Sequence, residues 1–475
     1  MSDEILQLNQ LDYSQPKIMN PSKKTEKIDI PINPNRYDEC VGGEQIPIIF
    51  ETMKPNTYID GSKSSLSFQL QVNAPIPLAP ADFAFYRFDL NEFSDSGSSV
   101  LNLFSDAQHQ TENNQTLYRE NYINVMQTFR NFRISPEHRQ NLTMIGASRP
   151  EVSYLQTTDP DFPAQPIYGI NKPNTFDIPF SAISPFWNTS QLLPAELLEK
   201  SALFLKVADP RLFLAGLNGQ ANTNTLVPVG TTVSFINISL KLHRTELYDN
   251  IQSAIKSSQL EFSYLANHNI VYQPTSTDFV IPVNLAAAKV SYVAVKFYKR
   301  DRVPTVDQTI TGGASIYDLS VKQGSPFYLD NNGLNGIRIQ AKIGEMLVPK
   351  FVIDTAPQAY ILTCDALDRV PFKNTENPDP LKIINQLSSG TIPYNNYCFN
   401  KRIANSYLYS QSTGCFCVAI NLQKYGGLSG LSTNANRLLA LHIEGLTNFA
   451  LYDAYVQVQY MSNVSMMENN IIVSK

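Results

Sequence analysis

An alternating run of apolar and polar side chains over residues 233–243 limits this part of the chain to a half-buried β-strand. Its apolar positions are Ile236, Ile238, Leu240 and Leu242, and its polar positions are Asn237, Ser239, Lys241 and His243. Successive side chains of a strand point to opposite faces of a sheet, so the apolar set is predicted to face a core. A short helix is predicted over residues 245–256, and the alternation resumes over residues 290–298. The chain is therefore expected to finish one β-sandwich here and to begin another.

The same period of two recurs in both halves of the chain. The predicted inward residues are Leu66, Phe68, Leu70 and Val72 in the first half, and Val293, Val295, Phe297, Ile337, Ile339, Ala341, Ile343, Leu439, Leu441, Ile443, Val456, Val458 and Tyr460 in the second. Further strands are predicted over residues 176–180 and 201–207. The clearest helix is predicted from the three-and-four spacing of Tyr118, Tyr122, Val125, Met126, Phe129 and Phe132. Many short strands separated by turns favour sandwiches over a parallel α/β sheet.

The length of 475 residues allows two to three domains. Residues 1–44 are polar and contain several prolines, and they are expected to form a partly flexible N-terminal arm. The first sandwich is expected over residues 45–248 and the second over residues 249–475. Exposed loops are predicted over residues 90–115, 300–324 and 365–405. Loops of this length in a compact domain are usually functional or interfacial.

Charge and targeting signals narrow the classes of function. The net charge is −5, and lysine and arginine form no dense patch, so direct sequence-specific binding of nucleic acid is not expected. The sequence contains no run of about 20 apolar residues, and therefore no membrane span is predicted. Residues 1–4 lack the positive start and apolar segment of a signal peptide, so synthesis in the cytosol is expected.

The sequence contains no recognisable catalytic or ligand-binding motif. Phosphate-binding, dinucleotide-binding, zinc-protease and nucleophile-elbow patterns are all missing. Five cysteines, an odd number, are predicted to be buried thiols: Cys40, Cys364, Cys398, Cys415 and Cys417. Acidic residues at 159–161 and at Asp330 could hold a cation, but turn chemistry explains them equally well. We therefore predict no catalytic residue, no cofactor or cofactor-binding residue and no metal ligand, and we expect a protein that is not an enzyme.

Four stretches carry a family likeness through their order and spacing. The first is residues 56–62 leading into the strand at 66–72, the second residues 176–180 with 191–194, the third residues 236–242 with the helix at 246–256, and the fourth residues 437–443 with 455–460. Together they span about residues 55–470. In this order they resemble the double jelly-roll major capsid proteins of double-stranded DNA viruses, in particular those of polinton-like viruses and virophages. The excursion at 365–405 and the alanine-rich run at 285–288 depart from the family pattern.

The resemblance implies an all-β fold of two consecutive eight-stranded jelly-roll sandwiches with a few short helices, a double jelly roll. It also implies a structural protein of the virion, with three copies forming a homotrimeric, pseudo-hexameric capsomer of an icosahedral shell. Partners would be further copies of the chain, together with minor, penton or cement proteins. Loops near 92–116, 300–325 and 365–405 would build the outer face and the subunit contacts, and the arm at 1–44 would lie on the inner face.

Two alternatives stay open on the residues alone. One is a carbohydrate-binding or carbohydrate-active β-sandwich protein, because a fold can bring two distant carboxylates together. Tyrosines would then replace tryptophan as the surface that stacks on sugars, since Trp187 is the only tryptophan. The other alternative is a minor or vertex capsid protein of the same lineage.

Overall fold

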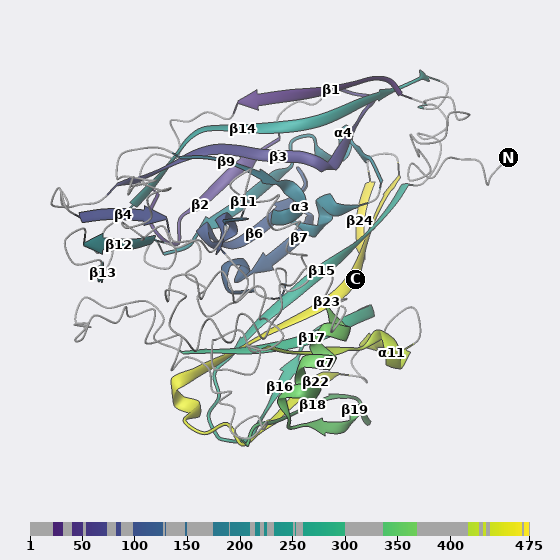
Figure 1. Ribbon diagram of the computed structural model, residues 1–475. Helices are drawn as coiled ribbons and strands as arrows, with labels where there is room; N and C mark the ends of the chain where they lie inside the picture. Colours follow the sequence, from purple (N-terminus) through teal and green to yellow (C-terminus); the bar gives the residue numbers. More distant parts are fainter. Residues whose placement is uncertain are drawn as a thin grey trace, which may run out of the picture.

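Antiparallel strands dominate both halves of the chain in the computed structural model (Figure 1). The structure describes residues 22–31, 40–50, 54–73, 82–86, 98–126, 129, 148–149, 174–189, 191–209, 214–218, 223–225, 232–249, 252, 260–299, 336–367, 417–426, 431–433, 438–467 and 470–474. Helices within these ranges are too short or too polar to span a lipid bilayer.

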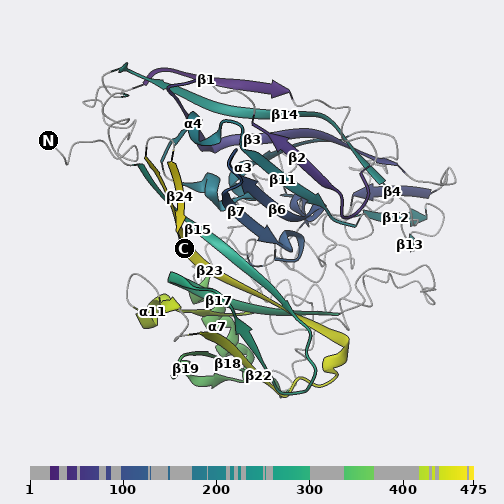
Figure 2. The same cartoon turned by 180° about the vertical axis from the view of Figure 1, so that it is seen from behind.

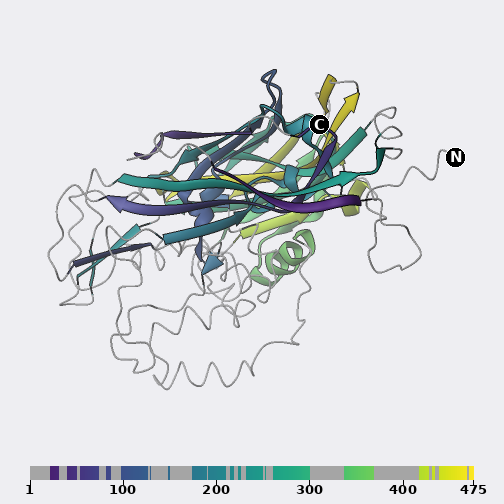
Figure 3. The same ribbon diagram turned by 90° about the horizontal axis from the view of Figure 1, so that it is seen from above.

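Two facing sheets form the first sandwich. One sheet has the order β1 (Ser22–Pro31), β14 (Thr232–Leu247), β3 (Thr57–Asn73) and β10 (Leu193–Pro194), with β9 (Asn174–Pro179) also paired to β3. The other has the order β2 (Gln45–Ile49), β11 (Ala202–Val207), β6 (Phe104–Gln110) and β7 (Thr116–Asn121). The Phe104 ring joins the layers, because its centroid lies 6.4 Å from that of Phe68 on β3 and 6.1 Å from that of Phe235 on β14. Strands β1, β14 and β3 lie side by side (Figure 3).

The second sandwich is built in the same way from later strands. One sheet has the order β15 (Leu260–Tyr272), β23 (Tyr452–Met467), β17 (Ala287–Lys299) and β20 (Cys417–Asn421), with β21 (Leu431–Thr433) on β17 and β24 (Asn470–Ser474) on β23. The other has the order β16 (Phe279–Val283), β22 (Leu439–Glu444), β18 (Arg338–Ile343) and β19 (Met346–Ile353). Helix α7 (Ala356–Ala366) packs on β20, where the Ala419 N–H donates to the Thr363 hydroxyl at 3.0 Å.

Short elements connect these sheets. They are β4 (Asp82–Tyr86), β12 (Leu214–Asn218) and β13 (Thr223–Thr225), which form one small sheet, β5 (Ser98–Ser99) and β8 (Ser148–Arg149), which form another, and η4 (Val100–Leu103), α3 (Phe180–Ile183), η5 (Pro185–Asn188), α4 (Ala195–Leu198), α11 (Gln423–Gly426) and η7 (Phe449–Leu451). The expected all-β architecture of two sandwiches with a few short helices is confirmed.

Most predicted strands are confirmed, and their inward residues are buried. This holds for Leu66, Phe68 and Leu70, for the alternating residues of β18 and β22, and for Val293, Val295, Phe297, Val456 and Val458. The side chain of Val72 lies outside the described residues. In β14 the prediction is wrong for Ile236, which is only partly buried, because Asn237 adopts a left-handed backbone with φ 51° and the register with β3 shifts there. This bulge changes which side chains face inward, so Val233 and Phe235 are buried before it and Ile238, Leu240 and Leu242 after it.

Three predicted segments differ in the structure. The loop expected at 90–115 contains β6, an interior strand of its sheet, whose residues Phe104, Ala107 and His109 are buried. The amphipathic helix begins only at Ile123, and Tyr118 lies in β7. Strand β14 continues to Leu247, so the helix expected from 245 starts later, and the Gln252 N–H donates to the Tyr248 carbonyl at 3.0 Å. The positions at 300–324 and 368–405 lie outside the described residues.

Part of the expected N-terminal arm is a strand of the first sandwich. Residues 22–31 form β1, which pairs antiparallel with β14 so that Ile28 lies opposite Leu242 and Ile30 opposite Leu240. The sheet edge that β1 provides contains Lys24 and Lys27 and ends at Pro31. Lysine and proline at an edge discourage pairing with a further strand, so β1 closes this side of the sheet. An arm that orders only against another molecule is therefore not what residues 22–31 form.

Candidate functional site at the seam between the sandwiches

The two sandwiches meet along strands that are buried on both faces. Residues 290–297 of β17 and 452–460 of β23 are all buried. In an isolated sandwich one face of these strands would meet water. Here β15 and β23 run from the second sandwich up to the first and pass beside β7 (Figure 2). We call this contact between β7 and the sheet of β15, β23 and β17 the seam.

A buried carboxylate lies at the centre of the seam. Glu120 on β7 is 1% exposed. Its Oε2 accepts the Tyr118 hydroxyl, and its Oε1 accepts the side-chain amide groups of Asn269 at 3.1 Å, Asn267 at 3.3 Å and Gln457 at 3.5 Å. Three of these four donors belong to the second sandwich. A carboxylate buried in protein needs such donors to replace the water that it loses, so Glu120 ties the two sandwiches together.

The network continues into both sandwiches. Asn269 donates to the Asn121 carbonyl at 2.7 Å and accepts from the Gln457 amide at 3.1 Å. The Tyr292 hydroxyl on β17 donates to Oε1 of Gln457 at 2.8 Å. Glu120, Asn269, Gln457 and Tyr292 are thus joined in one hydrogen-bonded network, and such a network fixes one orientation of the two sandwiches.

Aromatic side chains from the second sandwich complete the seam. The Tyr264 hydroxyl donates to the Leu117 carbonyl, and the Tyr264 ring contacts Phe186 of η5 edge-to-face at 5.5 Å. Burial raises the pKa of Tyr264 above its usual value. Burial raises the pKa of Tyr460 as well, and the charge of Glu120 adds to that increase. Both tyrosines therefore remain neutral hydrogen-bonding groups at physiological pH.

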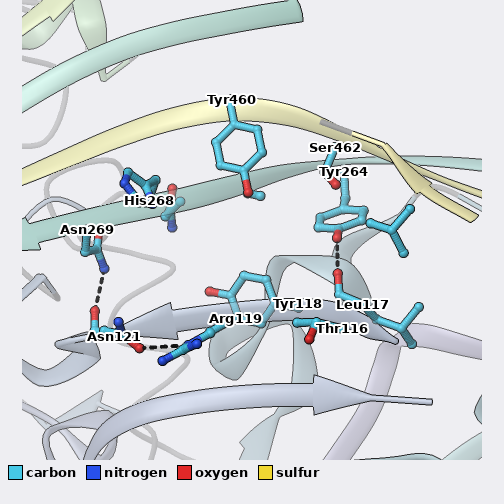
Figure 4. A pocket seen from close by; sticks show the side chains of 13 residues that line it. Thr116, Leu117, Tyr118, Arg119, Asn121, Tyr264, His268, Asn269, Tyr460 and Ser462 are labelled. Carbon is cyan, nitrogen blue, oxygen red and sulfur yellow. Dashed lines mark hydrogen bonds between the residues drawn. The ribbon is translucent and has the colours of Figure 1, made fainter. Parts of the chain in front are cut away.

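A pocket of about 460 Å³ opens beside the network (Figure 4). Strand β7 provides one wall, and β15 and β23 provide the other. Tyr460, Tyr264 and His268 lie across the pocket from Arg119 and Asn121 (Figure 4). The pocket is thus lined by hydroxyl, amide and cationic groups together with apolar side chains such as Leu117 and Val473.

A second buried titratable group lies inside the first sandwich. His109 on β6 is fully buried, and its ring stacks on Trp187 with centroids 5.8 Å apart and planes at 3°, and on Phe50 at 5.5 Å. Its Nε2 lies 2.9 Å from the Ser201 hydroxyl, which donates its own proton to the Leu198 carbonyl at 2.6 Å. Nε2 must therefore carry the proton of the neutral ring. Among the described residues Nδ1 has no hydrogen-bond partner, and burial lowers the pKa of His109 to about 3.

No residue of the seam was singled out from the sequence as a functional residue. Glu120 lies in a stretch predicted to be helical, and no motif distinguishes it from other surface carboxylates. Cys40 and Cys364 are buried, as predicted. Cys398, Cys415, the side chain of Cys417, the acidic positions 159–161 and Asp330 lie outside the described residues. Within the ranges that the structure describes, His, Cys, Asp and Glu side chains form no group of three able to hold a metal ion.

Comparison with known proteins identifies the fold. No protein-family model and no curated protein sequence matches the chain. The crystal structure of PBCV-1 VP54, fitted into a cryo-EM reconstruction of the virophage Sputnik, matches with a TM-score of 0.55 at 9% sequence identity, over 98% of this chain and 99% of that one. The cryo-EM structure of the Sputnik virophage matches with a TM-score of 0.52 at 12% identity, over 96% and 89%. A quasi-atomic model of the PBCV-1 virus capsid matches with a TM-score of 0.54 at 8% identity, over 98% and 99%.

These matches cover nearly the whole chain rather than one sandwich. They are to capsid proteins of double jelly-roll viruses, so the resemblance seen in the sequence is confirmed at the level of the fold. The two sandwiches that meet at the Glu120 seam therefore form a double jelly roll, the fold of these virus capsid structures.

Proposed function

We propose that the chain is a major capsid protein whose three copies form a pseudo-hexameric capsomer of an icosahedral virion shell. The likeness in fold to the PBCV-1 and Sputnik structures over at least 96% of the chain is the observation that carries the proposal. A chain with two upright sandwiches supplies six such units to a trimer, which suits a tile with sixfold neighbours. Its role would be structural rather than enzymatic.

The seam supports this role physically. A tile must keep its two sandwiches at one fixed angle, because each contacts different neighbouring copies. The buried network around Glu120 and Gln457 provides such a fixed angle. In this proposal the first jelly roll consists of β1 together with residues 45–248, the second consists of residues 249–475, and residues 1–21 contact neighbouring capsomers or minor, penton or cement proteins. The chain would be made in the cytosol of a host cell and would neither read nucleic-acid sequence nor enter a membrane.

The oligomeric state tests the proposal directly. The purified chain is expected to run at three times its mass of 53.2 kDa in size-exclusion chromatography with light scattering. Negative-stain images of the same fraction should show particles with threefold symmetry and a hexagonal outline. A monomer at all concentrations up to those of an assembly reaction would contradict the proposal. A trimer that never forms closed shells, with or without the other virion proteins, would instead favour a minor capsid role.

Removal of residues 1–21 separates trimer formation from shell assembly. This variant keeps β1, which pairs with β14 and belongs to the fold of the first sandwich. Its trimers are expected to form as in the full chain, while assembly into shells is lost or strongly reduced. Light scattering measures the trimer and electron microscopy counts the shells. If the variant is monomeric, residues 1–21 take part in the contacts within the capsomer rather than between capsomers.

A further inference from the structure

A groove runs along β7 beside the seam. It consists of two adjoining pockets of about 460 and 390 Å³ that share Arg119 and Asn121. The smaller pocket is lined by Gly43, Gln45, Asp106, Ala107, Gln108, Arg119, Asn121, Tyr122, Phe204 and Lys206. Amide and guanidinium groups in general form paired hydrogen bonds with neighbouring hydroxyl groups of a sugar. The lining of the smaller pocket is mainly polar, which suits a polar ligand rather than an apolar one.

Tyr122 gives this groove an exposed aromatic surface at a strained position. Its backbone is left-handed with φ 58°, a conformation that a bulky residue rarely adopts. The residue is 39% exposed, and its ring contacts Tyr455 of the second jelly roll edge-to-face at 6.0 Å. The Tyr122 carbonyl accepts the N–H groups of Val125 and Met126 at the start of the following helix, which holds this backbone in place. Strain kept by the fold at an exposed ring indicates a functional position.

The charges in the groove favour an acidic ligand. Lys206 has a carboxylate partner, since its Nζ lies 3.7 Å from Asp106. Arg119 uses its Nε to donate to Asn121 at 3.4 Å, and within the described chain its terminal nitrogens form no ion pair. Among the charged groups that line the groove, Arg119 is therefore the one without a carboxylate partner in the described chain. Guanidinium groups bind a carboxylate or sulfate through two parallel hydrogen bonds.

We propose that the groove between Tyr122 and Arg119 binds an acidic oligosaccharide, with one sugar ring stacked on Tyr122 and an acidic group paired with Arg119. The flat apolar face of a sugar ring suits an aromatic side chain, and jelly rolls serve as lectin domains as well as capsid domains. The inference concerns a ligand of the individual chain and does not depend on assembly into a shell.

A heparin-derived hexasaccharide, with maltohexaose as the neutral probe, tests the proposal by isothermal titration calorimetry on the full chain. The hexasaccharide is expected to bind, and to bind more weakly as salt is raised. Tyr122→Asn should weaken binding about tenfold, because asparagine tolerates the left-handed backbone but removes the ring. Tyr122→Phe keeps the ring and should bind as the original chain does. Arg119→Gln should lower the affinity for the acidic hexasaccharide about tenfold or more and leave the affinity for maltohexaose unchanged.

Tyr425→Asn is the matched control, because Tyr425 is 38% exposed on α11 and lies beside Lys424, away from the groove. It should bind the hexasaccharide normally. The proposal would be overturned if the original chain did not bind the hexasaccharide, or if Tyr122→Asn and Arg119→Gln bound it as tightly as the original chain does. Weakening by Tyr425→Asn to the same degree would show non-specific attraction and would overturn it too.

Discussion

Replacing Glu120 by alanine is expected to lower the free energy of unfolding by about 3 kcal/mol or more. The substitution removes the acceptor of four buried donors, from Tyr118, Asn267, Asn269 and Gln457. Each donor left without a partner costs about 1–3 kcal/mol, although water entering from the adjoining pocket can satisfy part of the set. Because three of the donors lie in the second jelly roll, the loss should also uncouple the two jelly rolls.

Urea unfolding followed by two probes measures both effects. Trp187 is the only tryptophan and is fully buried in the first jelly roll, so its fluorescence reports on that half, while circular dichroism reports on the strands of both. The two transitions are expected to coincide in the original chain and to separate in Glu120→Ala. Glu112→Ala is the matched control, since Glu112 forms an exposed ion pair with Lys200, and it should leave both transitions unchanged. Coincident, unshifted transitions in Glu120→Ala would show that Glu120 does not couple the two halves.

Acid is expected to destabilise the first jelly roll through His109. Between pH 6.5, the usual histidine pKa, and pH 3, near the lowered pKa of buried His109, the unfolded chain binds a proton that the folded chain does not. The stability that the neutral ring provides is therefore complete above pH 6.5 and falls as the pH drops toward 3. The loss between pH 7.5 and pH 5.0 should be about 2 kcal/mol. Protonation is unfavourable because burial removes the charged ring from water, and the described residues offer no acceptor for a second N–H on Nδ1.

Urea unfolding at pH 7.5 and at pH 5.0 measures this loss as the difference between the two free energies of unfolding. His109→Phe keeps the stacking on Trp187 and Phe50 but cannot be protonated. Its free energy of unfolding should therefore fall by about 2 kcal/mol less between the two pH values than that of the original chain. His442→Gln, on the outer face of β22, should keep the pH dependence of the original chain. An unchanged pH dependence in His109→Phe would mean that other groups cause the acid sensitivity.

Periodicity allowed the strands of both sandwiches to be predicted where alternation is uninterrupted. The inward residues of β3, β18 and β22 were found this way, because a strand whose one face is buried must alternate. The prediction was wrong where a local backbone event breaks the period. Asn237 shows this, since its left-handed backbone moves Ile236 out of the core. The helix predicted from the aromatic spacing around Tyr118 was wrong at its start. There a strand is followed at once by a helix, and the apolar residues of the two together have the spacing of one continuous helix.

What the sequence alone determined is the all-β class, the succession of two sandwiches and the core residues of their regular strands, because these follow from short-range alternation and turn residues. What only the tertiary structure decided is the seam: that Glu120, Asn269 and Gln457, far apart along the chain, form one buried network. Their polarity alone favours exposure to water. Burial becomes favourable only when each side chain finds its hydrogen-bond partners, and those partners come from distant strands that the fold brings together.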